Sequence, residues 1–196
     1  MEPIVRPLEL KDDLKQVARL VYETDDYIFP YLFDRDIAAA EKVISAMIGR
    51  DTIYHYKNIV IALLEDKIAG IVVLQKTPIR INSDEMRACF LDTGLNLGAH
   101  FERVLREYYE PLQDEPEGVY IANVCVDKAF RRMGVARKML KAVLNDRESY
   151  HLETVKGNAA ALRLYQSLGF ETVDEYMGFD TPCYRMKRTK QPPASH

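Results

Sequence analysis

The amino-acid sequence predicts one domain of the α/β (α+β) class, with helices layered on a mixed sheet of about six to seven strands. Three observations predict it. The chain has 196 residues, a length that suits one domain with its own core. Apolar runs typical of strands alternate with runs of helical periodicity. No repeat or change of composition divides the chain, so we expect a single domain over 1–188 and a flexible tail over 189–196.

Charge and composition argue against several classes of function. The formal net charge is −3, which disfavours binding nucleic acid or a membrane surface through bulk electrostatics. No apolar run approaches the roughly 20 residues that span a bilayer. The first residues are charged and lack the apolar core of a signal peptide. Cys89, Cys125 and Cys183 form no CxxC pair, which fits a reducing compartment, so we expect a cytoplasmic protein.

The first part of the chain predicts a short strand and two helices. Residues 4–8 are a short apolar run. Apolar residues at helical spacing predict helices over 13–23 and 37–48. The aromatic stretch 25–33 lies between these helices and surrounds a proline, so we expect a loop there.

The middle of the chain predicts a hairpin followed by an insert. Two Val/Ile-rich runs, 58–64 and 68–74, are separated by three charged residues, which predicts an antiparallel hairpin. The segment 79–118 is less regular. A helix can start at Ser83 and a second one can cover 101–108, so we expect a helical insert before the next strand.

The last part of the chain shows the clearest succession of elements. Gly169 predicts a helix end, and Pro182 predicts the turn between the last two strands. The expected elements are a strand at 120–126, a helix at 135–144, a strand at 150–155, a helix at 159–168, and strands at 170–179 and 183–187.

A basic loop that contains a glycine follows the strand 120–126 and leads into an amphipathic helix. Its residues are Arg131, Arg132, Met133, Gly134, Val135 and Ala136. First-turn amides of a helix lack intrahelical partners, and small residues let a phosphate approach them closely. Over 126–141 there are six basic residues and one acidic residue, which favours a polyanionic ligand. The alternative is a solvated basic face of a helix.

A second motif lies one strand downstream, where residues 157–170 read GNAAALRLYQSLGF. Together, the loop pattern [RQ]xxGx[GA] and the pattern N-x-x-A-x-x-L-Y-x-x-x-G-F resemble the signatures of the Gcn5-related N-acetyltransferase (GNAT) superfamily. The resemblance covers 119–170 and extends further only by element order. It implies a mostly antiparallel sheet flanked by about four helices, with the insert before the cofactor strand. It also implies direct transfer of acetyl from acetyl-CoA to a primary amine.

The resemblance assigns cofactor contacts to a strand, a loop and a helix start. It implies that backbone groups of Val124, Cys125 and Val126 pair with the pantetheine arm, that 131–136 hold the pyrophosphate, and that Asn158 contacts the cofactor. The plainer alternatives are a continuous buried strand, the solvated basic face, and an ordinary N-cap. Cys125 lies in mid-strand with no activating neighbour, so we expect no thiol nucleophile.

Two side chains are candidates for proton transfer. Tyr165 matches the family tyrosine that lies near the CoA sulfur and can protonate the departing thiolate; the alternative is a core aromatic. Glu153 lies five residues before Asn158. Members that resemble bacterial ribosomal-protein N-acetyltransferases carry their general base at this offset. The alternative is a surface charge on an edge strand.

The resemblance places the acceptor near 25–33 and near the insert. Asp25, Asp26, Tyr27 and Tyr31 suit a cationic amine through carboxylates and cation–π contact, and the insert adds further acidic residues. The alternative is an aromatic mini-core under a solvated acidic helix. We expect the acceptor to be a primary amine of a small molecule or a peptide.

A non-catalytic CoA-binding or regulatory module on the same fold is the alternative function. Glu153 and Tyr165 argue against it, because a pure binding module needs neither. His100 and His151 lack metal-ligand spacing, so we expect no metal. No nucleic-acid or membrane partner is expected, and a homodimer is kept as an option.

Overall fold

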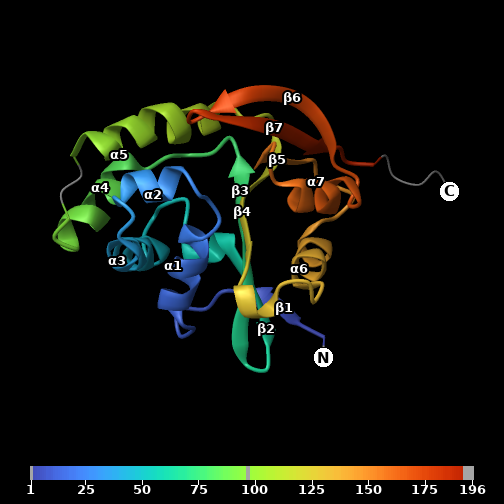
Figure 1. Cartoon of the computed structure of the whole chain (residues 1–196), viewed down its shortest axis with the longest axis horizontal. Helices are drawn as coiled ribbons and strands as arrows, with labels where there is room; N and C mark the ends of the chain where they lie inside the picture. The colour runs from blue at the N-terminus through green and yellow to red at the C-terminus, as the bar shows by residue number, and fades with distance from the viewer. Residues whose placement is uncertain (1, 96–97, 192–196) are drawn as a thin grey trace.

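Seven strands form one sheet in the part of the chain that the structure describes, residues 2–95 and 98–191 of a computed structural model (Figure 1). Their order is β1-β2-β3-β4-β5-β7-β6. Neighbouring strands are antiparallel, except that β4 and β5 are parallel, so the predicted mixed sheet is confirmed. The strands are β1 Ile4–Pro7, β2 Ile59–Leu64, β3 Lys67–Thr77, β4 Gly118–Val126, β5 Tyr150–Val155, β6 Glu171–Gly178 and β7 Thr181–Arg188.

Helices α1 to α5 lie on one side of the sheet (Figure 1). Helices α1 (Leu14–Tyr22) and α3 (Ile37–Ile48) each begin after an aspartate whose side chain accepts a first-turn amide, which is an ordinary N-cap. The loop expected over 25–33 is wrong in part, because a short helix, α2 (Ile28–Leu32), forms there. Its proline falls in the first turn, where the missing N–H removes no helical hydrogen bond.

The insert before β4 is helical, as predicted. It contains α4 (Ser83–Asp92), α5 (Gly98–Val104), a π-helical turn η2 (Leu105–Tyr109) and a 3-10 turn η3 (Glu110–Asp114). Phe90 of α4 stacks on Phe33 with ring centroids 5.5 Å apart and meets Phe101 of α5 edge-on at 5.2 Å. These aromatic contacts fix the insert on the helices that precede it.

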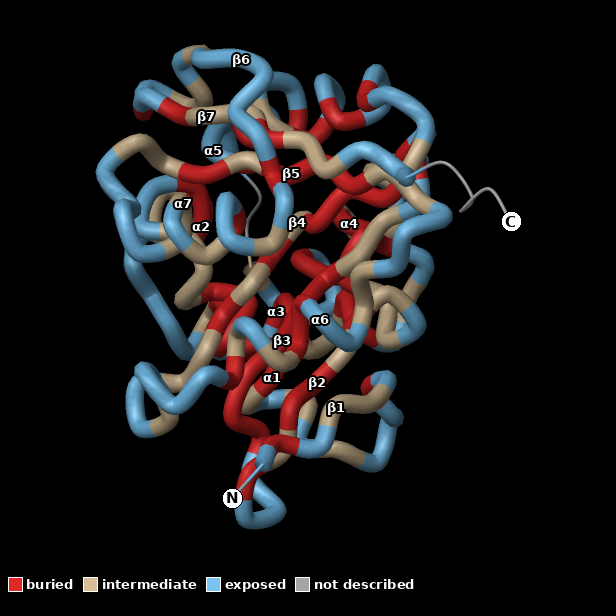
Figure 2. Tube along the Cα trace, turned by 90° about the vertical axis from the view of Figure 1, so that its right-hand side faces the viewer, coloured by how far each residue is buried: buried red, intermediate tan, exposed pale blue. Residues whose placement is uncertain are grey.

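Helices α6 (Val135–Val143) and α7 (Ala159–Gln166) lie on the other side of the sheet (Figure 1). Apolar side chains pack in two layers, one under α1–α5 and one under α6 and α7. Figure 2 shows the buried central strands between these layers and the largely exposed outer strand β6. No helix within the described ranges is long and apolar enough to cross a membrane.

The last hairpin does not turn at Pro182 as expected. The turn lies at Phe179 and Asp180, which have φ angles of 45° and 63°. Positive φ at both central residues is the geometry of a tight turn whose twist matches the flanking strands. Pro182 lies within β7, opposite Met177 of β6.

The tail expected over 189–196 is described only at its start. The amides of Lys190 and Gln191 donate hydrogen bonds to the loop before β5, which holds these two residues against the domain. Residues 192–196 lie outside the described residues.

The central strands β4 and β5 pair over a short distance. Three residue pairs join them, and the last is Ile121 with Leu152. Beyond this pair the two strands diverge, and residues 122–126 of β4 have no described partner on the β5 side. The sheet therefore consists of two half-sheets, β1–β4 and β5–β7, joined by a short parallel seam.

Candidate functional site

A cavity lies where β4 and β5 diverge. Its lining comes from the α1–α2 connection, η2 and the β6–β7 hairpin, as well as from β4, β5 and α7. Phe29 and Tyr108 reach it from the face of α1–α5, whereas Ala161 and Tyr165 reach it from the face of α7. The cavity therefore lies at the opening in the sheet and is lined by residues from both faces.

The basic loop lies beyond this cavity, at the far end of β4. Gly134 is the N-cap of α6 and adopts a left-handed conformation with a φ of 78°. In α1, α3, α4 and α7 a side chain caps the first turn, but α6 has no such cap. A Cβ at 134 would meet nothing within 4 Å. The first-turn amides, beginning with those of the buried Val135 and half-buried Ala136, are therefore not capped by the N-cap side chain, since Gly134 has none.

Side chains of the loop keep it attached to the strand and leave its basic groups accessible. The Nε of Arg131 donates to the carbonyl of Val126 at 3.1 Å, which ties the loop to the end of β4. Arg132 and Met133 are exposed. The arrangement offers positive charge next to free helix amides, which suits a phosphate group.

Residues 124–126 of β4 border the opening. Val124 lines the cavity and packs, like Val126, against the layer of α6 and α7, whereas Cys125 packs in the opposite layer. Burial raises the pKa of the Cys125 thiol to about 12, so it stays neutral at pH 7 and is a poor nucleophile. The backbone edge toward β5 is free to pair with an extended ligand.

Helix α7 places two of the predicted residues at the cavity. The Oδ1 of Asn158 accepts the amide of Ala161 at 3.1 Å, so the predicted N-cap is confirmed, and the same side chain lines the cavity. Tyr165 is 8% exposed and lines the cavity from the α7 face. Burial raises the pKa of its phenol to about 12, so the group keeps its proton through neutral pH.

Glu153 is the first residue of β5 after the seam. It lies on an interior strand between β4 and β7, not on an edge strand. Leu152 packs in the layer of α6 and α7, so alternation along the strand directs Glu153 to the opposite face. Its carboxylate pairs with Nη2 of Arg185 at 3.3 Å. Burial, and then the negative charge of Glu153, raise the pKa of the nearby Tyr176 hydroxyl. Glu153 also lines the cavity.

The α1–α2 connection supplies only part of the expected acceptor residues. Asp25 and Tyr27 line the cavity, whereas Asp26 and Tyr31 do not. The Oδ1 of Asp25 accepts the amides of Tyr27 at 2.7 Å and of Ile28. Burial raises the pKa of the Asp25 carboxyl, and these amides act in the opposite direction.

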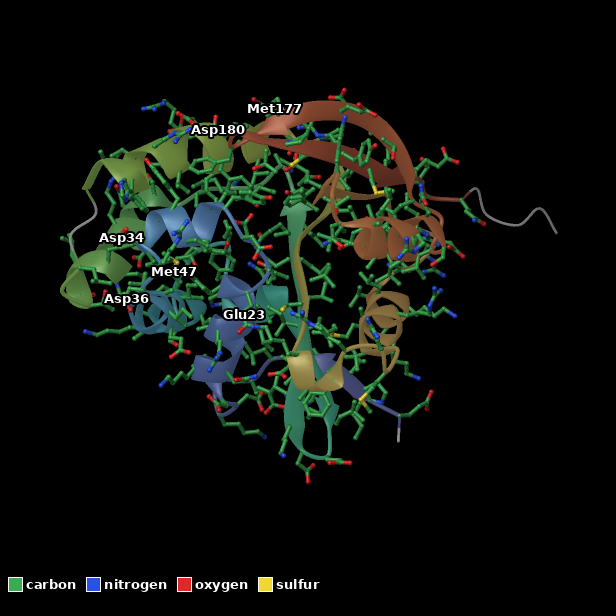
Figure 3. All side chains as sticks on the ribbon, in the orientation of Figure 1. Glu23, Asp34, Asp36, Met47, Met177 and Asp180 are labelled. Carbon is green, nitrogen blue, oxygen red and sulfur yellow. The ribbon has the colours of Figure 1, made fainter. Side chains whose placement is uncertain are left out.

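The insert reaches the cavity through aromatic contacts and not through its acidic residues. Arg103 of α5 pairs with Glu107 at 2.9 Å and with Asp180 of the β6–β7 turn at 2.6 Å. Its guanidinium lies 4.6 Å from the ring centroid of Phe179, which lines the cavity. Figure 3 shows Asp180 at the tip of the hairpin, above α5. The second contribution of the insert is Tyr108.

Several lining residues were not predicted. They include Thr24, Tyr108, Tyr120, Asn123, Tyr176 and Cys183. One signal was available in the composition, because the chain has 12 Tyr and no Trp. Five tyrosines line the cavity: Tyr27, Tyr108, Tyr120, Tyr165 and Tyr176.

Neither His100 nor His151 belongs to a cluster of metal-ligating groups among the described residues. His151 is 2% exposed, and burial lowers its pKa. His100 packs on the ring of Tyr31 with centroids 4.3 Å apart. Among residues 2–95 and 98–191, no group of three or more His, Cys, Asp or Glu side chains is placed to hold a metal.

A family model matches most of the chain. The family model described as "Acetyltransferase (GNAT) family" matches residues 21–170. The chain is 36% identical over 77 residues to "GCN5-related N-acetyltransferase 6, chloroplastic" from Arabidopsis thaliana; this stretch covers 36% of the chain and 27% of that protein. The match thus spans about a quarter of the relative's length.

Solved structures share the fold over nearly the whole chain. An N-acetyltransferase from Staphylococcus aureus Mu50 superposes with a TM-score of 0.69 at 22% identity, covering 94% of this chain and 99% of that chain. Naa50 from Arabidopsis thaliana, in complex with the bisubstrate analogue CoA-Ac-MVNAL, gives a TM-score of 0.54 at 15% identity, covering 96% and 99%. At such low sequence identities, the similarity to these two structures shows a shared fold only.

A family match over residues 21–170 defines the class of this protein as well as its fold. The chain belongs to the acetyltransferase (GNAT) family.

Proposed function

We propose that this protein transfers the acetyl group of acetyl-CoA directly to a primary amine of a small molecule or a peptide. The observation that carries the proposal is the cavity at the sheet opening. Glu153 lines it on the face of α1–α5, and Tyr165 lines it on the face of α7. An acceptor from one face and a thioester from the other face can meet between a base and an acid.

The residues present fit acetyl-CoA as co-substrate. The free backbone edge of Val124, Cys125 and Val126 suits the pantetheine arm. The uncapped start of α6 and the basic loop 131–136 suit the pyrophosphate. Asn158 at the cavity can contact the ligand while its Oδ1 caps α7.

Proton transfers at the nitrogen and at the sulfur complete the proposed reaction. Acetyl-CoA supplies a thioester, in which the C–S bond breaks as the new C–N bond forms. Glu153 removes a proton from the amine, directly or through water, because only a neutral amine can attack. Tyr165 donates its proton to the departing sulfur, which a phenol with a pKa of about 12 can do at neutral pH. Glu153 releases the ammonium proton to solvent and takes a second proton from the nitrogen as the amide forms. This second proton balances the one that the sulfur gains.

The proposed class of acceptor is tested by thiol release from acetyl-CoA against polyamines, aminoglycosides, amino acids and peptides. Turnover with at least one primary amine supports the proposal. Binding of acetyl-CoA without turnover of any amine would contradict it and leave the non-catalytic module.

The proposed base is tested with Glu153→Gln, which keeps the size of the side chain and removes the carboxylate. Activity should fall on the acidic limb of the pH–rate profile by about 10²-fold or more, and rising pH should partly restore it, since more amine is then neutral. Glu175→Gln is the matched control. Glu175 lies on the exposed strand β6, where it pairs with Lys156. An unchanged pH profile in Glu153→Gln would show that Glu153 is not the base.

A further inference from the structure

Asn123 of β4 has a buried oxygen without a hydrogen-bond partner. The residue is 7% exposed, and its Oδ1 accepts no hydrogen bond within the described part of the chain. Most buried polar atoms in proteins are paired, because an unpaired one forfeits its hydration. Asn123 lines the cavity in the sheet opening, so a bound molecule can supply the missing donor.

A hydrogen-bond relay determines which end of the Asn123 amide faces the cavity. The hydroxyl of Thr24 donates to the carbonyl of Val21 at 2.6 Å. A hydroxyl has one proton, so Thr24 can only accept from Asn123. The Nδ2 of Asn123 donates to Thr24 Oγ1 at 2.8 Å, which turns Oδ1 away from this partner. The orientation of the amide is thus fixed by its network.

An irregularity in β4 directs Asn123 to the acceptor face. The register of β3 and β4 shifts at Ala122, which is a bulge. Ile121 and Val124 pack in the layer of α6 and α7, whereas Ala122 packs in the layer of α1–α5. The side chain of Asn123 reaches Thr24, in the connection that follows α1. Two consecutive residues thus face the same side, which a regular strand does not allow. Asn123 therefore shares the face of Glu153.

We propose that the Oδ1 of Asn123 accepts the N–H that the acceptor nitrogen keeps during the reaction, and that the site thereby selects primary amines. The inference rests on the proposed function. A neutral primary amine carries two N–H groups. It loses one proton as the C–N bond forms and the C–S bond breaks, and it keeps the other N–H in the amide product. Glu153 takes the first, and Asn123 holds the second.

This arrangement distinguishes primary from secondary amines. A neutral secondary amine has a single N–H, which it must lose to form the amide. It therefore leaves the Oδ1 of Asn123 unpaired in the filled cavity. Sites built to bind a donor discriminate against analogues that lack it, because the buried acceptor loses its partner.

The test measures steady-state kinetics with a primary amine that the wild type accepts and with its N-methyl derivative. Asn123→Leu keeps a side chain of similar size and removes the acceptor. We expect kcat/KM for the primary amine to fall about tenfold and the preference over the N-methyl amine to shrink by a similar factor, with KM for acetyl-CoA unchanged. The matched control is Asn58→Leu, which removes a half-buried amide outside this cavity.

The hydrogen bond between Asn123 and Thr24 allows a second, independent test with two variants of Thr24. Thr24→Val removes the acceptor that orients Asn123, and we expect it to reduce the preference for the primary amine. Thr24→Ser retains the hydroxyl and should restore the preference relative to Thr24→Val. If Asn123→Leu fails to fold, the comparison of Thr24→Val with Thr24→Ser still tests whether Asn123 selects primary amines.

The outcomes separate the inference from the proposed function. If the wild type acetylates no amine at all, the proposed function and the role of Asn123 are both wrong. If the wild type is active but Asn123→Leu keeps its preference, or loses activity equally with both amines, the inference alone is overturned. Equal preferences in Thr24→Val and Thr24→Ser also overturn it.

Discussion

Helices α6 and α7 lie on the same side of the sheet, and each follows a central strand, but they begin in opposite ways. The chain caps α7 itself, through the side chain of Asn158. It leaves α6 uncapped and starts it with a left-handed Gly134. The first-turn amides of α6 are thus available to an external anion, whereas α7 contributes the side chain of Tyr165 to the cavity. The start of α6 is therefore suited to binding a ligand through backbone amides, whereas α7 is suited to binding one through its side chains.

The largest expected effect comes from closing the start of α6. Gly134→Glu should abolish CoA binding, because it places bulk and negative charge in front of the free amides. Calorimetric titration with CoA measures the effect. Gly134→Asn is the matched control, since asparagine tolerates the left-handed conformation and adds no charge. Equal CoA affinity in the folded glutamate variant would remove this loop from the site.

The side-chain contribution of α7 is tested with Tyr165→Phe. Turnover should fall by about 10²–10⁴-fold with nearly unchanged affinity for acetyl-CoA, because only the proton donor is lost. Burial raises the pKa of Tyr165 to about 12, so ionisation of this group should not reduce the wild-type rate between neutral pH and about pH 10. Tyr184→Phe is a control outside the cavity. A Tyr165→Phe enzyme with full turnover at all pH values would contradict the assignment.

The smallest effect concerns the two roles of Asn158. Asn158→Ala should lower the free energy of unfolding by about 1 kcal/mol, because it removes the N-cap. Asn158→Ser keeps a capping oxygen and should recover most of this stability, as measured by urea denaturation. If the serine variant is stable but binds CoA less tightly, the side chain also contacts the ligand. If it binds CoA as the wild type does, Asn158 acts only as a cap.

Local signals explain which parts of the fold could be predicted from the sequence. The start of α7 depends on Asn158 and its own first turn, and the end of α3 lies next to Gly49, so neighbouring residues suffice. The short helix α2 was missed because aromatic residues and Pro30 obscured its periodicity. The turn at Phe179 and Asp180 was missed because two non-glycine residues adopt positive φ there.

The residues of the candidate site also differ in whether neighbouring sequence could predict them. Glu153 and Tyr165 were proposed because each has a fixed offset from a motif. Asn123 gave no such signal, since its orientation depends on a bulge and on a contact with Thr24, 99 residues away. Tyr108 comes from a π-helical turn, which periodicity does not reveal. Contacts between distant segments decide these positions.

The short parallel seam between β4 and β5 also bears on how the domain resists unfolding. Three residue pairs join the two half-sheets, and a ligand that pairs with the free edge of β4 would extend this connection. Such a ligand binds the folded chain and stabilises it in proportion to the logarithm of its concentration. Amide hydrogen exchange along the divergent ends of both strands should then slow when the co-substrate binds. A higher concentration of co-substrate would thereby make separation of the two half-sheets rarer.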